Sequence, residues 1–480
     1  MACSDTASFT DDQRLAYQAL VDGRNVFLTG EAGKGKSFVL EAFIEHCKRE
    51  RRQILAMAPT GIAALNLTNG TTIHRTLGIP ANFCDPNAPI GLPRKVLQRA
   101  EVIIIDEISM CRIDLFERVV RMIVAAQSAT GTKQVVLVGD FFQLSPVVTQ
   151  RDLEAMMAFY PGNPDGYCFK SNFWKGLNLE AHVLRTVHRT VEEEYVAALN
   201  LARNGDPSCI PFFNRRAVND RSKVPADALW LCTRNANADN INAARLANLP
   251  GSPAIFVAKK DGNLGKGDAP TSDELPLKVG ARVMSVLNDK DGRFLNGTLG
   301  TVVDVGRDGV EVVFDGSFQR VEVGPHTWKV EKAVVVDDKD ENGDKINRIM
   351  LDEVGSFTQL PLRLAWAVTI HKAQGQTIMG PVAVESHAFT CGQLYVGLSR
   401  SVRAEDITVY PKIEPRYLKA RREIQEFYDE ISEGRYELKG MQVPGMAQLP
   451  PEVARYIAET GASVTDALMH FVSMGIESAS

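Results

Sequence analysis

The chain has 480 residues, of which 45% are hydrophobic and 24% are charged, so it can bury large cores and is expected to form two or more domains. Its apolar content excludes global disorder, and the lack of an apolar run of about 18 residues excludes a membrane span. The net charge of −5 excludes a generally basic surface, so any nucleic-acid site is expected to be a local groove.

The N-terminus and the cysteines indicate an intracellular protein. Residues 1–13, MACSDTASFTDDQ, have neither a basic nor an apolar stretch, which argues against a signal peptide. The eight cysteines are scattered without a CxxC pair, as is typical of reduced thiols rather than of disulfides or zinc ligands. We therefore expect a cytoplasmic protein, or a nuclear or mitochondrial one in a eukaryote, with no membrane partner.

Short apolar strands alternate with helical stretches over the first 140 residues. Continuous β-branched runs, typical of a parallel sheet covered on both faces, are found at 25–30, 53–58, 101–105 and 134–138. Each run ends in a polar or glycine-rich turn, and such turns meet at one ligand crevice in open α/β sheets. A second set of strands of this kind is predicted at 180–185, 228–233, 360–370, 381–386 and 407–411.

The pattern changes between residues 255 and 354, where short strands are separated by Asp-Gly and Asn-Gly turns, a hairpin signature. We interpret this stretch as a small, barrel-like antiparallel β domain inserted into the second α/β domain. The predicted fold is therefore α/β, with a first domain at 1–180, a second at 181–254 and 355–440, and a helical tail at 441–480.

A phosphate-binding loop is predicted at GEAGKGKS, because the motif follows a strand and precedes a helical stretch. Its glycines let backbone N–H groups turn toward a phosphate without a Cβ in the way, and the helix N-terminus adds its positive end. Lys36 is placed to reach the β- and γ-phosphates, and Ser37 to bind Mg²⁺. The nucleotide-binding residues assigned to this loop are Gly30, Gly33, Lys34, Gly35, Lys36 and Ser37.

Two acids that follow the apolar run Val102–Ile105 complete a predicted hydrolysis site. Asp106 is the second Mg²⁺ ligand, and the adjacent Glu107 is placed to orient or deprotonate a water molecule. Gln143, after the strand QVVLV, can sense the γ-phosphate, and Arg400 of the second domain can stabilise charge on the transferred phosphate. The protein is expected to hydrolyse a nucleoside triphosphate.

The order of the motifs resembles that of superfamily-one DNA helicases, and most closely the Pif (petite integration frequency) family, with RecD-type helicases as neighbours. The resemblance covers residues 8–405 and rests on GEAGKGKS, APTGIAALNL, GTTIH, IIIDEISM, VLVGDFFQLSPV, LRTVHRT, LAWAVTIHKAQGQT and LYVGLSR. It implies two RecA-like domains that share one ATP and Mg²⁺. It also implies that Arg189 contacts the γ-phosphate, Gln13 the adenine, and that Gly375 lies near the nucleotide.

The sequence departs from the family pattern at three places. His188 and Thr190 flank Arg189 where Phe and Gln are usual, Ser145 replaces a proline, and Ala373 stands where Ser is common. Thr190 cannot make all the hydrogen bonds of a glutamine, and Ala373 removes one hydroxyl.

The resemblance also implies that single-stranded DNA crosses the tops of both domains, where hydrogen-bond donors suit backbone phosphates. The residues assigned to DNA are Thr60, Gly61, Thr72 and His74 in the first domain and Thr233, Asn235, His371, Lys372, Gln374 and Thr377 in the second. Residues 78–93, rich in Pro and Gly, are either an element that splits the duplex, with Phe83 stacking on bases, or a plain surface loop.

The predicted function is that of an ATP-dependent DNA helicase that acts as a monomer on single-stranded, tailed or forked DNA. The resemblance alone implies 5′-to-3′ movement, action on G-quadruplexes, and roles in replication, repair, recombination and telomere maintenance. Two alternatives stay open: a RecD-like motor subunit of a recombination or repair complex, and an ATP-gated DNA-binding switch that does not unwind.

Overall fold

The computed structural model describes residues 9–432 with short gaps. Outside the description are residues 32, 61–62, 65–66, 68–69, 92–94, 186–192, 263–270, 295–296, 340–344, 376–377 and 379, together with the side chains of 128–130 and 330–354. The predicted helical tail at 441–480 also lies outside it. No helix of the part described is both long and apolar enough to cross a membrane.

The first lobe is built on a six-stranded parallel sheet in the order β3-β2-β4-β5-β1-β6. The strands are β1 Val26–Gly30, β2 Ile54–Ala58, β3 Thr71–Thr72, β4 Val102–Ile105, β5 Gln134–Val138 and β6 Glu180–Leu184. Alternate residues of β1 point to opposite faces, so Phe27 joins one core while Val26 and Leu28 join the other. Burial on both faces explains why these strands are apolar throughout.

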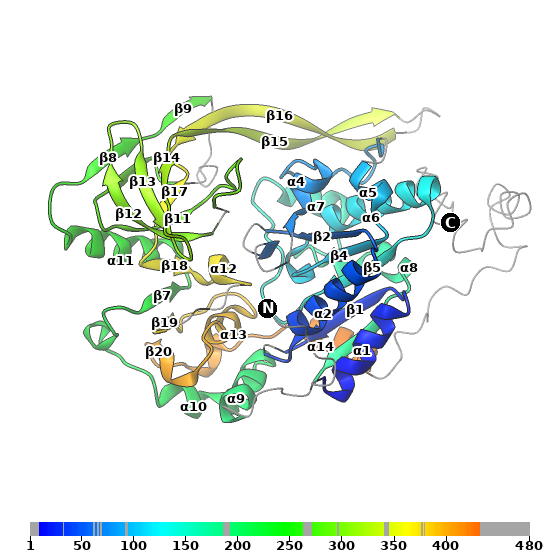
Figure 1. Ribbon diagram of the computed structural model, residues 1–480, viewed down its shortest axis with the longest axis horizontal. Helices are drawn as coiled ribbons and strands as arrows, with labels where there is room; N and C mark the ends of the chain where they lie inside the picture. Colours follow the sequence, from blue (N-terminus) through cyan, green and yellow to red (C-terminus); the bar gives the residue numbers. More distant parts are fainter. Residues whose placement is uncertain are drawn as a thin grey trace, which may run out of the picture.

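Helices cover both faces of this sheet (Figure 1). α1 and α2 pack on one face, and α5, α6 and α8 on the other. The helices of the first lobe are α1 Asp11–Val21, α2 Lys36–Arg49, α4 Ile73–Leu77, α5 Lys95–Arg99, α6 Ile113–Thr130, α7 Leu153–Phe159, α8 Asn172–Gly176 and α14 Arg422–Ser432.

The second lobe has a smaller parallel sheet in the order β18-β7-β19-β20. Its strands are β7 Leu229–Cys232, β18 Ala367–Thr369, β19 Val382–Glu385 and β20 Ile407–Tyr410. Its helices are α9 Glu193–Arg203, α10 Ile210–Asn214, α11 Asn235–Ala247, α12 Ile370–Ala373 and α13 Gln393–Leu398. In Figure 1, α12 and α13 lie on the side of this lobe that faces the first.

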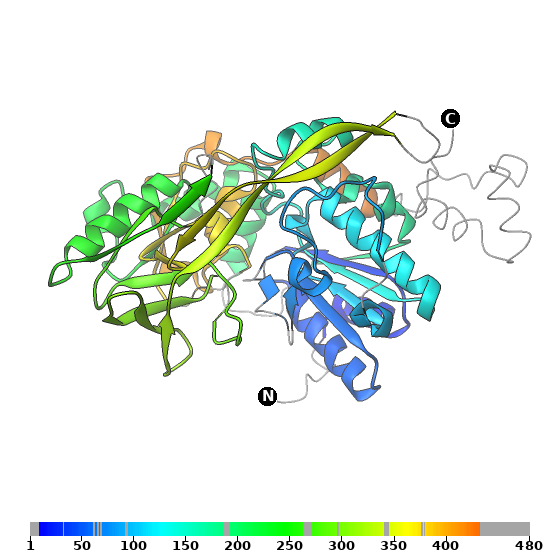
Figure 2. The same cartoon turned by 90° about the horizontal axis from the view of Figure 1, so that it is seen from above.

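An antiparallel domain is inserted between β7 and β18, two strands that pair directly with each other. Its strands are β8 Ala254–Val257, β9 Lys259–Gly262, β10 Glu274–Leu277, β11 Arg282–Ser285, β12 Leu299–Val305, β13 Val310–Phe314, β14 Arg320–Val323, β15 His326–Lys339, β16 Lys345–Gln359 and β17 Leu362–Leu364. β15 and β16 form a long ribbon that crosses the first lobe, where β15 contacts α7 (Figures 1 and 2). The predicted fold class, two RecA-like α/β domains with an antiparallel insertion, is confirmed.

Three segments differ from the expected boundaries. β6 pairs with β1 and therefore completes the first sheet rather than opening the second. β17 pairs with β11 in the inserted domain, so the apolar run at 360–370 divides between two sheets. α14 was expected in the second domain, but its apolar face packs into the core of the first lobe, because Phe427 and Tyr428 find aromatic partners there.

The segment at 78–93 also differs in one respect from what was expected of a duplex-splitting element. Phe83 is buried and packs against Phe159 and Tyr160, with the guanidinium of Arg112 over its ring. A ring held in this way cannot stack on DNA bases, so the expectation for Phe83 was wrong.

Candidate nucleotide and DNA sites

The phosphate-binding loop connects β1 to α2, and two of its glycines are required by close contacts. A Cβ at Gly30 would lie 2.5 Å from the Leu184 carbonyl oxygen, and one at Gly35 would lie 2.6 Å from Gln13 Nε2. Gly35 also has φ +84°, a left-handed conformation that side chains rarely adopt, at the N-cap of α2. The loop therefore needs glycine at both ends to turn into the helix.

Lys36 lies at the inner rim of this loop. Its Nζ donates hydrogen bonds to the carbonyl oxygens of Gly30 at 2.7 Å and Glu31 at 3.1 Å. Burial lowers the pKa of Lys36, while the charges of Asp140 and Glu107 act in the opposite direction. Next to it, Ser37 is exposed in the first turn of α2, where its hydroxyl can take a metal ion.

Gln13 and Lys34 stabilise the phosphate-binding loop through hydrogen bonds and an ion pair. Lys34 is buried, and its Nζ binds Glu31 Oε2 at 3.2 Å and the Arg185 carbonyl oxygen at 2.7 Å. Gln13 is fully buried, donating from Nε2 to the Lys34 carbonyl oxygen at 3.1 Å and accepting at Oε1 from the Thr10 N–H at 3.2 Å. Its amide thus supports the loop, and its contact with adenine stays a prediction.

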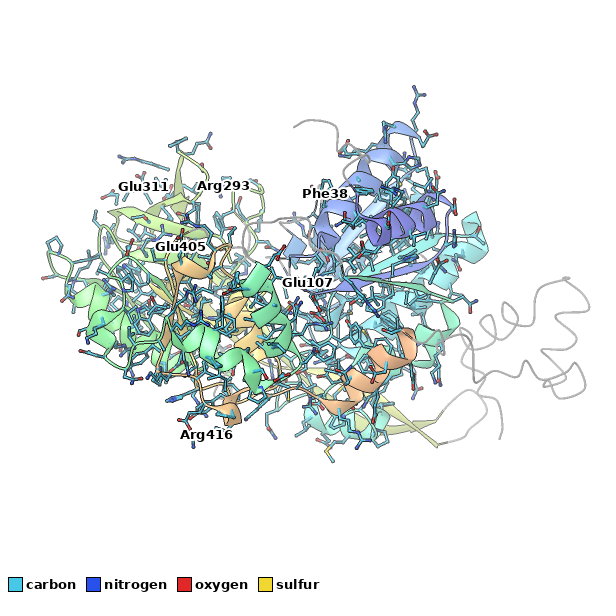
Figure 3. The ribbon with its side chains drawn as sticks, turned by 90° about the horizontal axis from the view of Figure 1, so that it is seen from below. Phe38, Glu107, Arg293, Glu311, Glu405 and Arg416 are labelled. Carbon is cyan, nitrogen blue, oxygen red and sulfur yellow. The ribbon has the colours of Figure 1, made fainter. Side chains whose placement is uncertain are left out.

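Asp106 and Glu107 follow β4, and their charges act on Lys36 at the end of the phosphate-binding loop. The Glu107 N–H donates to Asp106 Oδ1 at 2.8 Å. Burial and the neighbouring Glu107 raise the pKa of Asp106 to about 7, and burial also raises the pKa of Glu107. Glu107 has φ +49°, a strained conformation for a residue with a Cβ, and such strain is concentrated at functional sites. Figure 3 places Glu107 where the two lobes meet.

Three groups of the second lobe approach Glu107 from across the cleft. Gln374 hydrogen-bonds the carboxylate of Glu107, and Arg400 lies close enough for its charge to lower the pKa of that carboxyl. A Cβ on Gly375 would lie 3.5 Å from Glu107 Oε1. Arg400 is buried, with its Nε bonded to the Val396 carbonyl oxygen at 2.9 Å. The cleft thus brings Glu107 of the first lobe close to Arg400 and Gln374 of the second.

Two buried oxygen atoms in the nucleotide cleft can accept a hydrogen bond from a ligand. Within the part of the chain described, Glu107 Oε2 and Gln374 Oε1 are buried without a hydrogen-bond partner. Gln143, also buried, accepts from Gln374 Nε2 at 3.4 Å. Unpaired buried polar atoms are rare in native proteins, and a water or substrate atom between the lobes would satisfy them.

Asp140 is a residue that the sequence reasoning passed over. Arg203 of α9 binds it with Nη2 at 2.8 Å and Nε at 3.0 Å, so the ion pair joins the lobes. Tyr428 Oη of α14 lies 3.3 Å from Asp140 and 2.6 Å from Thr29 Oγ1, next to the phosphate loop. Burial alone would raise the pKa of Asp140, but Arg203 outweighs it and the pKa is lowered. The partners of Asp140 in this cluster, Arg203 and Tyr428, are far from it in the sequence. No local sequence pattern could therefore have predicted the cluster.

The first-lobe residues assigned to DNA lie on neighbouring turns beyond β2 and β3. Thr60 Oγ1 accepts from the Ala63 N–H at 3.3 Å, and Thr72 Oγ1 caps α4 by accepting from the Arg75 N–H at 3.2 Å. His74 Nδ1 lies 3.1 Å from the Ile79 carbonyl oxygen, and burial lowers its pKa. The side chains are partly exposed, so their DNA contacts stay predictions.

On the second lobe, His371 and Lys372 lie on α12, at the carboxyl end of β18. Burial lowers the pKa of both, that of Lys372 to about 8, and the nearby charge of Arg363 contributes while Asp239 opposes. The neighbouring charges of Lys372 and Arg363 favour an anionic ligand, because a phosphate would relieve the repulsion between them. Asn235 is exposed in the first turn of α11.

Two residues assigned to DNA are buried in the structure. Thr233 is buried, and its N–H and Oγ1 both donate to Glu385 Oε2, at 2.6 and 2.8 Å. Gln374, the C-cap residue of α12, is buried inside the cleft beside Glu107. Gly61, Arg189 and Thr377 lie outside the described residues, so their predicted roles cannot be placed.

A pocket of about 430 Å³, lined by other residues than the nucleotide cleft, opens between the lobes beside His371. It is lined by Ser145, Pro146, Val147, Val148, Thr149, Gln150, Leu153, Pro164, Asp165 and His371. Phe389, whose ring centroid lies 6.5 Å from that of His371, is half-exposed, and the guanidinium carbon of Arg234 lies 5.0 Å from its ring centroid. Neither Phe389 nor Arg234 was predicted from the sequence, although Arg234 lies between Thr233 and Asn235, which were both assigned to DNA.

Comparison with known proteins agrees with this arrangement. A model of the PIF1-like helicase family matches residues 8–195. Bacteroides Pif1 bound to single-stranded DNA is 30% identical, with a TM-score of 0.73 over 88% of this chain and 97% of that one. The chain belongs to the Pif1 helicase family.

Pif1 relatives match along most of this chain. The ATP-dependent DNA helicase Pif1 of Campylobacter jejuni is 28% identical over 80% of this chain and 88% of its own. The human enzyme of that description is 30% identical over 90% of this chain, which spans 65% of the human protein. A solved structure that concerns DNA unwinding at forked duplex DNA by two coordinating Pif1 helicases has a TM-score of 0.74 and 30% identity, and the match covers 89% of this chain and 98% of that one.

Proposed function

We propose that this chain is an ATP-driven motor that moves along single-stranded DNA and unwinds tailed or forked duplexes. One observation carries the proposal: Glu107 of the first lobe faces Arg400 and Gln374 of the second across a single cleft. A hydrolysis site divided between two lobes links the state of the nucleotide to the distance between them. Family membership supports DNA as the track.

The residues of the cleft fit ATP and Mg²⁺. Lys36 and Arg400 offer positive charge to the phosphates from opposite sides. Ser37 and Asp106 offer two hard oxygen ligands, the small protein contribution typical of a Mg²⁺ ion that also binds substrate phosphates. When bound, the ion would neutralise phosphate charge. Glu107, with one buried oxygen lacking a partner, is the group that orients and deprotonates the attacking water.

Helix α12 connects hydrolysis to the DNA track. Gln374, just past its end, faces Glu107 in the cleft, whereas Lys372 lies two residues earlier beside Arg363. The helix α12 has only four residues and forms a single turn, with Gln374 directly after it. A movement of Gln374 toward the nucleotide must therefore also displace Lys372. The Asp140–Arg203 pair supplies a second connection between the lobes. Alternate tightening of the two lobes on the strand would produce steps.

We propose 5′-to-3′ movement on the family resemblance, and the test uses duplexes with either a 5′ or a 3′ single-stranded tail. The unaltered chain should displace the strand from the 5′-tailed duplex in the presence of ATP and Mg²⁺. Unwinding of the 3′-tailed duplex alone would reverse the polarity, and DNA binding without strand displacement would favour the ATP-gated switch.

Glu107→Gln should bind ATP and single-stranded DNA normally but hydrolyse ATP at least about 100-fold more slowly, because an amide cannot accept the proton of water. Steady-state phosphate release and DNA-binding anisotropy measure the two properties. Glu45→Gln, on the exposed face of α2, is the matched control and should leave hydrolysis unchanged. Equal hydrolysis by Glu107→Gln and the unaltered chain would contradict the assigned role.

A further inference from the structure

The helix α13 ends two residues before Arg400, and the end of any helix leaves carbonyl oxygens that lack a partner within the helix. All four such oxygens of α13 accept a hydrogen bond. Those of Tyr395 and Gly397 accept backbone N–H groups of the following turn, at 2.9 and 3.3 Å. That of Val396 accepts Nε of Arg400 at 2.9 Å. The last one, on Leu398, accepts from a different helix.

The donor to the Leu398 carbonyl oxygen is the hydroxyl of Tyr195, on α9. Tyr195 Oη lies 2.8 Å from this oxygen and 3.1 Å from the Ser401 carbonyl oxygen. Leu398 and Ser401 stand on either side of the turn that carries Arg400. Tyr195 is buried, so its hydroxyl takes the place that water has at an exposed helix end. One hydroxyl thus holds both ends of the Arg400 turn.

Core packing fixes the ring that carries this hydroxyl. The Tyr195 ring is stacked with that of Phe212, with 6.3 Å between centroids and 14° between the planes. It meets the Phe213 ring edge-on, also at 6.3 Å. Tyr195, Phe213 and Leu398 all belong to the buried core of the second lobe. The hydroxyl therefore has little freedom to follow a displaced carbonyl oxygen, and it determines where the turn lies.

The two helices that Tyr195 joins are also attached to the first lobe. α9 and α13 lie side by side (Figure 1). Arg203, the last residue of α9, donates from Nη2 to Asp140 Oδ1 at 2.8 Å, and Tyr395 Oη of α13 donates to Asp140 Oδ2 at 3.3 Å. One carboxylate of the first lobe therefore binds both helices, and Tyr195 connects them again at the Arg400 turn.

We propose that Tyr195 is a positioning residue for Arg400, and that its hydroxyl sets where the guanidinium stands relative to the reacting phosphate. The inference rests on the proposed function, because Arg400 can act on a phosphate only if the cleft hydrolyses ATP. Without the hydroxyl, the buried Leu398 carbonyl oxygen would lack its donor, and the turn would shift until another was found. Arg400 would shift with the turn, and a small misplacement of a catalytic group greatly slows a reaction.

The test removes one oxygen atom, in Tyr195→Phe, and measures steady-state phosphate release by the full chain with Mg²⁺ and an excess of oligothymidine. kcat should fall roughly ten-fold and KM for ATP should stay within about two-fold, because Arg400 acts on charge that develops during the transfer. Tyr160→Phe is the matched control. It removes a tyrosine hydroxyl that donates to Glu117 Oε2 at 2.8 Å, outside the nucleotide cleft, and should change neither constant.

A double variant separates positioning from a general effect on the fold. Arg400→Ala should lower kcat more than Tyr195→Phe does, and adding Tyr195→Phe to it should cause no further loss, since the hydroxyl acts only through the guanidinium.

A further loss in the double variant would overturn the positioning role. An unchanged kcat in Tyr195→Phe, a loss that appears in KM instead, or an equal loss in Tyr160→Phe would overturn it as well. If the unaltered chain did not hydrolyse ATP, with or without DNA, the proposed function itself would be refuted, which distinguishes the two failures.

Discussion

Single residues in the cleft carry environments that their residue types do not reveal. Glu107 combines a left-handed backbone, a raised pKa and a buried oxygen without a partner among the described residues. Each property is unfavourable in a folded protein, and together they are expected where a reaction requires them. Lys372 shows a comparable balance on the DNA side, since burial and Arg363 disfavour its charge.

The lowered pKa of Lys372 predicts a pH dependence of DNA binding. In the free protein its pKa is about 8, lowered by burial and by Arg363 and opposed by Asp239. A bound phosphate favours the charged form, so above about pH 8 binding takes up a proton and the affinity falls, by up to about ten-fold per pH unit. Anisotropy measured between about pH 7 and pH 9 at constant ionic strength should show this decline.

Lys372→Arg provides the control for this titration, because a guanidinium keeps its charge over the whole range. Its affinity for single-stranded DNA should stay nearly level where that of the unaltered chain declines. Parallel curves for the two proteins would show that Lys372 is not the titrating group.

At the scale of elements, α14 is the segment whose place is least evident from the order of the chain. It follows the last strand of the second lobe, yet Phe427 stacks on Phe169 with 4.3 Å between ring centroids in the first lobe. Tyr428 of the same helix reaches Thr29 and Asp140. The helix therefore ties the end of the second lobe to the phosphate loop and to the ion pair between the lobes.

Phe427→Ala should lower the free energy of unfolding by about 3–5 kcal/mol, because it opens a cavity in an aromatic core. Phe318→Ala, which removes the same atoms from a fully exposed position, should change it by less than about 0.5 kcal/mol. Urea unfolding followed by circular dichroism compares the two. Similar losses in both variants would contradict the packing of α14 on the first lobe.

At the scale of the whole molecule, a protein with net charge −5 must bind a polyanion through a narrow track. Among the described residues of the second lobe, the cations near the residues that we propose to contact DNA are Arg234, Arg363 and Lys372. Most of the remaining interaction must come from neutral donors, apolar contacts and the closeness of the two lobes.

Binding of single-stranded DNA should therefore depend only weakly on salt. With about three phosphates neutralised, log affinity should fall with log salt concentration with a slope of about −2. A titration of binding against potassium chloride concentration measures the slope. A slope steeper than about −5 would indicate many more phosphate contacts and contradict the narrow track.

The sequence by itself determined the fold class, the phosphate loop and the acids after β4, because local spacing dictates them. A glycine-rich turn between a strand and a helix turns backbone N–H groups toward a phosphate, and acids that follow a neighbouring parallel strand lie at the same edge of the sheet. The parallel strands were likewise evident as apolar runs, since burial on both faces leaves no polar positions.

Only the tertiary structure decided which distant residues meet. Arg203 on Asp140, α14 on the first sheet, the burial of Phe83 and Thr233, and the exposure of Phe389 depend on how the lobes pack, over separations that no local pattern encodes. A residue type records what a side chain can do, whereas burial and the charges around it decide what it does.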